Sequence, residues 1–285
     1  MNSKNGLKAG GLRKLIAYIV LIILAFLCLF FFYILIINST RNHAQIQQGF
    51  SAVPGKAFMK NFNNVLNDAN VPIVSGIKNS FVISACSAAL AVYFSALTAY
   101  GLYAYDFKLK KPAFVFILLI LVMPTQVSAL GFLRLVKSIP FMKDNLLPLI
   151  VPSIAAPAVF YFMYSYMQSS LPMELVEAAR IDGCSEFKTF NRVVMPILKP
   201  ALAVQAIFVF VSSWNNYFMP ALVIDRKELK TLPILIASLR GADFLKFDMG
   251  KVYMLIMLAI VPIIIVYILL SKYIVAGVAL GGVKE

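Results

Sequence analysis

Residues 15–37 read LIAYIVLIILAFLCLFFFYILII, a hydrophobic run without a single charged side chain. A helix of about 20 apolar residues is long enough to cross the roughly 30 Å hydrocarbon core of a membrane. The run is longer than the core of a signal peptide, and no small-residue cleavage site follows it. The sequence therefore predicts an uncleaved transmembrane helix at residues 15–37.

Five further runs of the same kind follow along the chain of 285 residues. None contains Asp, Glu, Lys or Arg, and they cover residues 79–104, 113–133, 146–167, 201–224 and 252–270. Hydrophobic residues make up 61% of the chain and charged residues 13%, with a mean hydropathy of +0.86. A soluble domain of this size needs far more polar surface. We predict an all-α membrane protein with six transmembrane helices, in which residues 1–14 form a tail and residues 15–285 a single membrane domain.

The net charge of +14 comes from basic residues in the short segments between these spans. No stripe of them alternates with aromatic side chains, so we expect a membrane surface rather than nucleic acid as their partner. Six spans place both termini and residues 168–200 on one side, where half of the 26 basic residues lie. The two sides therefore carry equal numbers of basic residues, but their local density differs. The tail directly before the first span has several basic residues and no acidic one. We therefore predict that both termini are cytoplasmic.

Residues for catalysis or metal binding are missing from the sequence. It has no Gly-x-x-x-x-Gly-Lys-Ser/Thr phosphate loop, so ATP hydrolysis cannot be assigned to this chain. The chain has three cysteines and one histidine, and their spacing matches neither a metal site nor a disulfide framework (Cys28, Cys86, Cys184 and His43). Ion-coupled transporters usually hold ionisable residues within the membrane, and the spans have none. This absence disfavours an ion-coupled single-chain transporter, which we keep as the alternative to an ATP-driven one. A scaffold subunit that has no pathway is a third possibility.

Residues 168–200 form the longest segment on the cytoplasmic side, and their pattern predicts two short helices with a break. Pro172 suits a first helical turn, and Gly183 is placed to end that helix in a left-handed conformation. Ser185 is suited to begin the next helix, and Pro196 prevents its simple continuation. We expect a compact polar elbow, which is suited to receiving force from another protein.

The same segment resembles the coupling loop of ABC importer permeases. The resemblance rests on Glu177-Ala178-Ala179, on Gly183 four positions later, and on Val193-Val194-Met195-Pro196. The family has Ile and Leu where this chain has Val193 and Met195, which are conservative in size and polarity. Without the resemblance, the segment reads as a solvated helical hairpin in which Glu177 pairs with Arg180 at i, i+3.

The resemblance extends from about residue 79 to the end of the chain. It covers four further stretches, which are Asn79-Ser80 through Gly101, Trp214-Asn215-Asn216-Tyr217-Phe218-Met219-Pro220, Thr231-Leu232-Pro233, and Val275-Ala276-Gly277 through Lys284. These resemble the smaller, six-span partner in a permease pair of the maltose-type carbohydrate uptake family. The resemblance implies the type I ABC importer permease fold in a bacterial cell membrane.

The family also implies partners and roles for particular residues. The first elbow helix would dock on one of two cytoplasmic ATPase subunits, which hold the ATP and Mg that this chain lacks. A second permease and an extracellular or periplasmic substrate-binding protein would complete the importer, with residues 225–251 reaching toward the binding protein. The expected coupling residues are Glu177, Ala178, Ala179, Asp182, Gly183 and Pro196, of which Asp182 is added because of its adjacency.

Uncharged polar side chains in the outer half of two spans are candidates for a substrate path. They are Thr125 and Gln126 in the third span and Trp214, Asn215 and Asn216 in the fifth, each about 20 Å from the inner end at the helical rise. Amides offer donors and acceptors, and an indole stacks on sugar C–H groups. Anchoring at the membrane interface and contacts between helices are competing roles. The partner permease can also supply most sugar contacts in this family, and Gln205, Ser212 and Ser213 are weaker candidates.

Prolines interrupt three of the predicted spans. They are Pro124 in the third, Pro148, Pro152 and Pro157 in the fourth, and Pro262 in the sixth. Each frees a backbone carbonyl and allows a kink. The kinks are either gating hinges or static packing features, and the sequence favours the static role.

Overall fold

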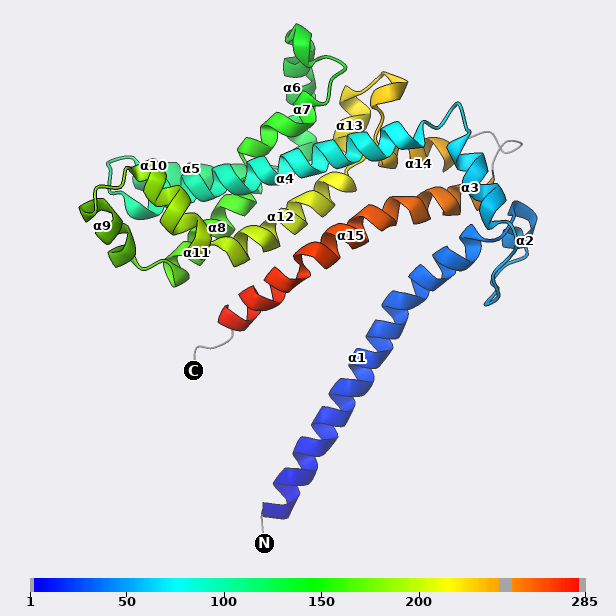
Figure 1. Cartoon of the computed structure of the whole chain (residues 1–285), viewed down its shortest axis with the longest axis horizontal. Helices are drawn as coiled ribbons and strands as arrows, with labels where there is room; N and C mark the ends of the chain where they lie inside the picture. Colours follow the sequence, from blue (N-terminus) through cyan, green and yellow to red (C-terminus); the bar gives the residue numbers. More distant parts are fainter. Residues whose placement is uncertain (1–2, 241–247, 282–285) are drawn as a thin grey trace. The chain divides into compact units, whose positions relative to one another are not determined.

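The computed structural model describes residues 3–240 and 248–281, and every regular element in this part of the chain is a helix (Figure 1). Residues 1–2 of the expected tail, residues 241–247 of the expected outer loop and residues 282–285 lie outside the described part. The chain forms two compact units. One comprises Met1–Val71 and Leu239–Leu258, and the other Pro72–Ser238 and Ala259–Glu285.

Among the described residues, four helical stretches are long and apolar enough to cross a membrane. They are Arg13–Ser39 in α1 (Ser3–Ser39), α4 (Ile73–Ala104), Leu147–Ser170, and Met249–Leu269 in α15 (Met249–Gly281). Two bent helix pairs raise the number to six if each pair is one span. Each of the six regions overlaps one of the six apolar runs of the sequence, although the second pair, Glu186–Trp214, shares only residues 201–214 with the fifth run.

The first unit contains α1, α2 (His43–Gln47), α3 (Phe58–Leu66) and the start of α15. Its buried cation is Arg41, which donates to the Asn38 Oδ1 at 3.1 Å and to the Gly49 carbonyl oxygen at 2.9 Å. Asn61 of α3 donates to the carbonyl oxygens of Ser39 and Arg41, both at 2.9 Å. Because a buried charge is tolerated only when it is hydrogen-bonded, this network fixes the segment that follows α1.

The second unit is built around α4, against which α8 (Pro157–Ser170) and α12 (Lys199–Trp214) pack. Small side chains on α4 allow this close approach, as is typical of helices packed within a membrane. Those that are buried include Ser84, Ser87, Ala88, Ala91, Ser95, Ala96 and Ala99.

The fourth predicted span is a segmented helix. It consists of α7 (Leu147–Ile150), the 3₁₀ turn η2 (Val151–Ile154) and α8. Its three prolines stand in the first turn of the three pieces, where the missing N–H costs least. Ser87 and Ser95 of α4 donate to the carbonyl oxygens of Leu149 and Ala156, both at 3.3 Å. The interruptions are thereby tied to α4.

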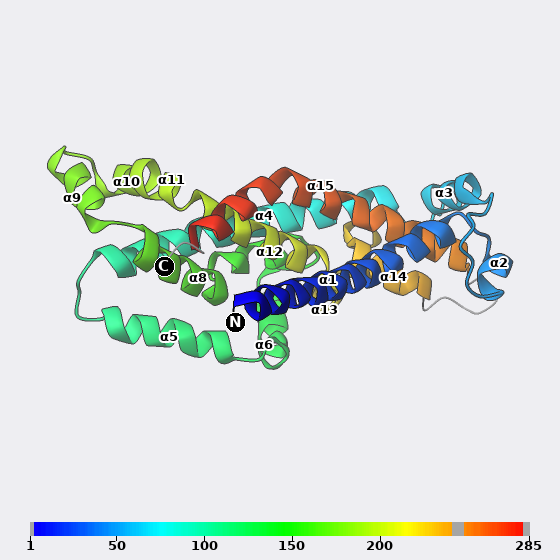
Figure 2. The same ribbon diagram turned by 90° about the horizontal axis from the view of Figure 1, so that it is seen from below.

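The third predicted span is bent, and the fifth is interrupted. Helices α5 (Lys110–Val122) and α6 (Thr125–Ser138) meet at Pro124 with an angle of 99° (Figure 2). Helix α12 ends at Trp214, and the short α13 (Phe218–Val223) follows. The depths that we assigned along straight spans at residues 113–133 and 201–224 therefore need correction. Pro262, by contrast, lies within α15, which continues past it.

Short elements connect the spans of the second unit. They are η1 (Pro140–Met142), α9 (Met173–Ile181), α10 (Glu186–Thr189), the π-helical turn η3 (Phe190–Val194), α11 (Met195–Ile197), η4 (Lys227–Leu229) and α14 (Leu232–Arg240).

Candidate functional site

The segment at residues 168–200 folds into the elbow that the sequence predicts. Helix α9 ends where Gly183 adopts a φ of +75°, and the amides of Gly183 and Cys184 donate back to the carbonyl oxygens of Arg180 and Ala179. This arrangement satisfies the last carbonyls of the helix and requires the left-handed conformation that glycine adopts easily. Ser185 precedes α10, although its side chain makes no capping hydrogen bond.

The second arm of the elbow leads back toward the membrane. The stretch Glu186–Ile197 and helix α12 form the second bent pair, with an angle of 81°. Pro196 stands in the short α11 just before the bend and is exposed. The position of this proline agrees with its predicted role in preventing a straight continuation.

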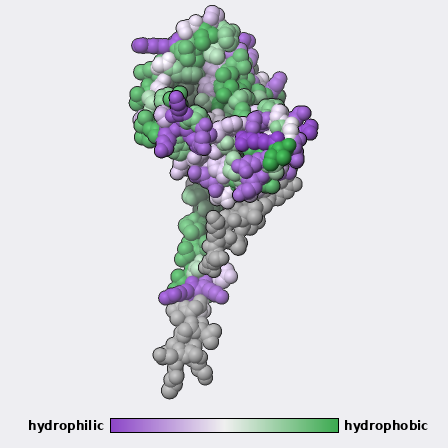
Figure 3. Space-filling model, turned by 90° about the vertical axis from the view of Figure 1, so that its left-hand side faces the viewer, coloured by the Kyte–Doolittle hydropathy of each residue, from purple (hydrophilic) through white to green (hydrophobic). Residues whose placement is uncertain are grey.

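The free surface of the elbow carries both apolar and acidic side chains. Leu175, Ile181 and Phe187 are 47%, 86% and 66% exposed. Exposed acidic residues lie among them at Glu174, Glu177 and Asp182. Figure 3 faces this end of the chain and shows apolar areas in green among hydrophilic side chains in purple. Leu175 and Ile181 lie outside every candidate span, and apolar surface bordered by polar side chains is typical of a protein contact.

Five of the six expected coupling residues are accessible in this arrangement. Glu177, Ala178, Asp182, Gly183 and Pro196 are exposed. Ala179 is only 8% exposed and belongs to the inner face of α9. Its small side chain therefore fits α9 against the rest of the elbow and does not form part of its outer surface.

An ion pair holds the two arms of the elbow together. Arg180 Nε lies 2.8 Å from Glu186 Oε1, and Tyr100 of α4 donates to Glu186 Oε2 at 3.0 Å. The hydrogen bond from Arg180 holds the pKa of the Glu186 carboxyl below its usual range. Arg180 also lies over the ring of Tyr105, 5.2 Å from its centre. The i, i+3 pair of Arg180 with Glu177 is not formed, because Glu186 takes its place.

Phe190 anchors the elbow in the core of the second unit. Its side chain is fully buried, with ring centres 5.7 Å from Tyr93 and 5.6 Å from Tyr100 of α4. The same apolar cluster includes Val176 of α9 and Val159 of α8. The elbow therefore shares a close-packed apolar cluster with α4 and α8.

Two adjoining cavities lie on the side of the unit where the predicted polar residues gather. The first, of about 410 Å³, is lined by residues of α4, α6, α7, η2, α12 and α13, including Thr125, Ser128, Ser213 and Asn216. The second, of about 340 Å³, adds Ser87, Ser153, Gln205 and Ser212. Leu149, Ser213 and Asn216 line both cavities. Neutral donors and acceptors on an otherwise apolar wall suit an uncharged, hydroxyl-rich solute.

The five residues predicted for the path have different surroundings. Thr125 and Asn216 line the first cavity, whereas Gln126 and Asn215 are exposed and line neither of the two. Trp214 is 2% exposed, stacks on Phe210 with ring centres 5.7 Å apart, and donates from Nε1 to the Ala259 carbonyl oxygen at 3.2 Å. Trp214 therefore connects α12 with α15 and does not face the cavities.

Sequence reasoning missed some lining residues and undervalued others. Ser128 and Ser153 were not identified, since single serines in apolar runs are common. Gln205 and Ser212 of α12 and Asn216, two residues after its end, follow one another at spacings of seven and four. That spacing places them on one face of a helix. It is the signal that distinguishes them from Trp214.

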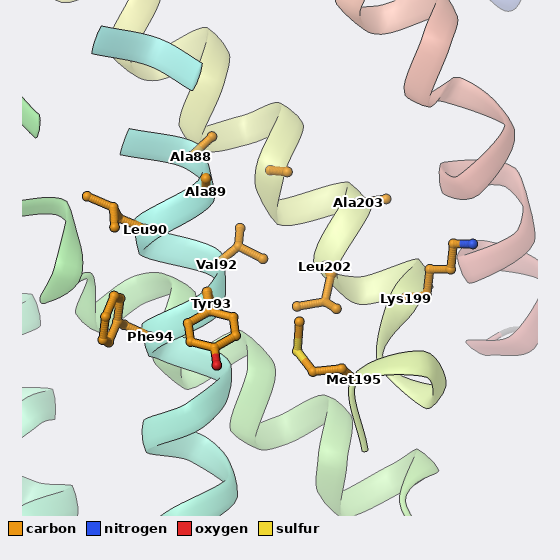
Figure 4. A pocket seen from close by; sticks show the side chains of 11 residues that line it. Ala88, Ala89, Leu90, Val92, Tyr93, Phe94, Met195, Lys199, Leu202 and Ala203 are labelled. Carbon is orange, nitrogen blue, oxygen red and sulfur yellow. The ribbon is translucent and has the colours of Figure 1, made fainter. Parts of the chain in front are cut away.

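A third cavity of about 630 Å³ lies between α4 and the region of α11 and α12 (Figure 4). Val92 and Tyr93 of α4 face Met195 and Leu202 across it. Alanines at positions 88, 89, 203 and 206 complete most of its wall, and Lys199 stands at its edge. Because this wall is almost wholly apolar, the cavity does not suit a polar solute.

Comparison with known proteins identifies the family. Residues 91–279 match the family described as "Binding-protein-dependent transport system inner membrane component". The chain belongs to this family.

Individual relatives agree with the family assignment. The arabinooligosaccharides transport system permease protein AraQ of Bacillus subtilis (strain 168) is 32% identical over 209 residues, which are 72% of each chain. The melibiose/raffinose/stachyose import permease protein MelC of the same organism is 28% identical over 254 residues, which are 89% of this chain and 90% of MelC. In a crystal structure of a bacterial ABC transporter that imports alginate, one chain superposes with a TM-score of 0.78 at 20% identity, covering 93% of this chain and 98% of that one.

Membership defines what kind of molecule this is. The chain is a multi-pass inner membrane protein and the permease subunit of an ABC importer, with no catalytic role of its own. Such a system depends on a binding protein and on an ATPase, which are separate partners. The single-chain ion-coupled transporter and the scaffold without a pathway are therefore no longer supported.

Proposed function

We propose that this chain is the smaller, six-span permease of a pair that moves a sugar or oligosaccharide into a bacterial cell. Both termini and the elbow face the cytoplasm, and residues 15–285 form the membrane domain. The names of its relatives, which import arabinooligosaccharides or melibiose, raffinose and stachyose, support the substrate class. The neutral polar side chains that line the two adjoining cavities are consistent with it. A second permease completes the pathway, and ATP and Mg bind to the two ATPase subunits.

The observation that carries the proposal is the exposed apolar and acidic face of the elbow. Ile181 is 86% exposed and Phe187 66%, and apolar surface rimmed by polar residues marks protein interaction sites. Glu177 and Asp182 add negative charge to that face, which would suit a partner surface with basic side chains. We assign the docking contacts to Glu177, Ala178, Asp182 and Gly183.

The packing of the elbow suggests how ATP binding reaches the cavities. Phe190 shares one apolar cluster with Val159 of α8, and Val159 lines the second cavity. When the two ATPase subunits close, the displaced elbow carries α4 and α8 with it. The walls of the cavity then move relative to the second permease, and the path opens toward the outside.

Two substitutions on the elbow test the proposal. Glu177→Lys reverses the charge of the docking face, and Gly183→Trp places a bulky side chain at a φ that only glycine adopts easily. We expect both variants to insert into the membrane, to copurify with much less ATPase, and to lose uptake.

The matched control is Asp106→Lys, a charge reversal in the loop between α4 and α5. The side chain of Asp106 is fully exposed and pairs only with the neighbouring Lys110, so its replacement leaves the elbow intact. Normal copurification and uptake in both elbow variants would contradict the proposal.

A further inference from the structure

The loops that follow α6 and α13 are joined by a single carboxylate. Oδ1 of Asp144 accepts hydrogen bonds from the backbone amides of Asp225 at 3.1 Å and Arg226 at 2.9 Å. Asp144 lies between η1 and α7, and the two amides lie between α13 and η4. Segments about 80 positions apart in the chain thereby meet at one oxygen atom.

The backbone of Asp144 supports this contact at an energetic cost. Its φ is +53°, and it is the one residue other than glycine with a positive φ in the described part of the chain. Aspartate and asparagine tolerate the left-handed region better than other side chains, but they adopt it as single residues with a local reason. Here that reason is the direction in which the carboxylate must point.

A second attachment of the same loop is buried. Asn79 of α4 donates to the carbonyl oxygens of Glu228 at 2.8 Å and Lys230 at 3.2 Å. Ser80, beside it, accepts from the amide of Leu232 at 2.9 Å. Asn79 and Ser80 are 7% and 2% exposed, whereas Asp225 and Arg226 are exposed. In the segment at residues 225–232, the end near Leu232 is therefore fixed on α4 by buried hydrogen bonds. The end near Asp225 is held by exposed hydrogen bonds to Asp144, which water can replace.

The two loops joined by Asp144 lead into the wall of the first cavity. Pro148, four residues after Asp144, and Pro220, five residues before Asp225, both line it. The carboxylate thus joins the loop between α6 and α7 to the loop after α13, and all three helices contribute residues to the cavity wall.

We propose that Asp144 is a positioning residue for transport, which holds the outer edge of the substrate path closed in the resting importer. The inference rests on the proposed function, because that orientation places both loops outside the membrane. Opening of the path breaks the two exposed hydrogen bonds of Asp144, while Asn79 and Ser80 keep the far end of the loop on α4.

Accessibility from outside gives a direct test. Ser213 lines both adjoining cavities and is half-buried, and Ser213→Cys is placed in a chain whose three native cysteines are replaced by serine, within the assembled importer. The rate of labelling by a membrane-impermeant maleimide is measured on intact cells. Asp144→Gly removes the carboxylate and relieves the backbone, and Asp144→Ala removes it without relief. We expect both to raise the labelling rate by about fivefold or more, because each removes the acceptor of two exposed hydrogen bonds.

Two variants separate the hydrogen bonds from other effects. Asp144→Asn keeps an acceptor oxygen and the left-handed preference, so we expect labelling at the wild-type rate. Lys143→Ala removes a neighbouring exposed charge without touching these hydrogen bonds, and should also leave the rate unchanged. Equal labelling in all four variants would overturn the inference, as would a change confined to Asp144→Ala, because that result would reflect backbone strain.

A second measurement keeps the two proposals distinguishable. The ATPase activity of the purified importer with Mg-ATP, and without binding protein, should rise in Asp144→Gly but not in Asp144→Asn. The elbow variants act on ATPase binding and should leave the labelling of Ser213→Cys unchanged when the purified importer is labelled without ATP. Faster labelling in the Asp144 variants together with normal ATPase binding in the elbow variants would support the role of Asp144 alone. The reverse result would support the docking role of the elbow alone.

Discussion

At the scale of single residues, Phe190 joins the cytoplasmic elbow to the membrane core. Its ring lies between Tyr93 and Tyr100, and none of it is exposed. Force applied to the elbow must pass through contacts of this kind, because the ion pair between Arg180 and Glu186 is partly exposed and therefore weak.

We predict that Phe190→Ala destabilises the protein by about 3–5 kcal/mol, because it leaves a cavity in a close-packed cluster. The detergent-solubilised variant should unfold at a clearly lower temperature and couple ATP hydrolysis poorly to uptake. Phe187→Ala is the control, since Phe187 is 66% exposed three residues away. It should unfold near the wild-type temperature and yet bind less ATPase. Equal stability of the two variants would show that Phe190 is not an anchor.

The sequence predicts the placement of some of the candidate path residues and not of others. A helix face was readable for Gln205, Ser212 and Asn216, because spacing alone places them together. The burial of Trp214 was not readable, since an indole in the outer half of a span suits an interface, a sugar path or a hydrogen bond to a neighbouring helix equally well. The acceptor of its N–H, the Ala259 carbonyl oxygen, is 45 positions away in the chain.

At the scale of elements, the six apolar runs predicted the helices well and their continuity poorly. Length and hydropathy report how far a segment can extend, whereas a bend depends on which groups replace the lost backbone bonds. Pro124 coincides with a 99° angle, while Pro262 lies within a continuous helix. For the fourth span the replacements are visible, since Ser87 and Ser95 donate to its carbonyls. No pattern within one span predicts hydrogen bonds from another.

The polar face of α12 leads to a prediction at this scale. Gln205 lines the second cavity, whereas Gln126 of α6 is exposed and lines neither of the two adjoining cavities. We expect Gln205→Ala to raise the half-saturating substrate concentration for uptake by about fivefold, as the loss of one hydrogen bond would. Gln126→Ala, the same chemical change outside these cavities, should leave it unchanged. The two variants are compared in cells by uptake at increasing substrate concentration, and a larger effect at Gln126 would place the path elsewhere.

At the scale of the whole molecule, the number of crossings decides which side the elbow occupies. The structure has four unbroken candidate spans in the described residues, and two bent pairs that are either broken spans or re-entrant loops. Both termini lie on one side in either case, so they cannot distinguish the two. With six crossings the elbow shares the side of the termini, and with four it lies on the opposite side.

Cys184 reports on this choice, because it lies in the elbow and is half-buried. We predict that, in a chain with Cys28→Ser and Cys86→Ser, a membrane-impermeant maleimide labels Cys184 only after the cells are permeabilised. In the same background with Cys184→Ser, Lys143→Cys between α6 and α7 should be labelled in intact cells, because six crossings place that loop outside. The opposite pattern would mean that both bent pairs are re-entrant. The elbow would then lie outside, out of reach of any cytoplasmic ATPase. The hydrogen bonds of Asp144 would face the cytoplasm.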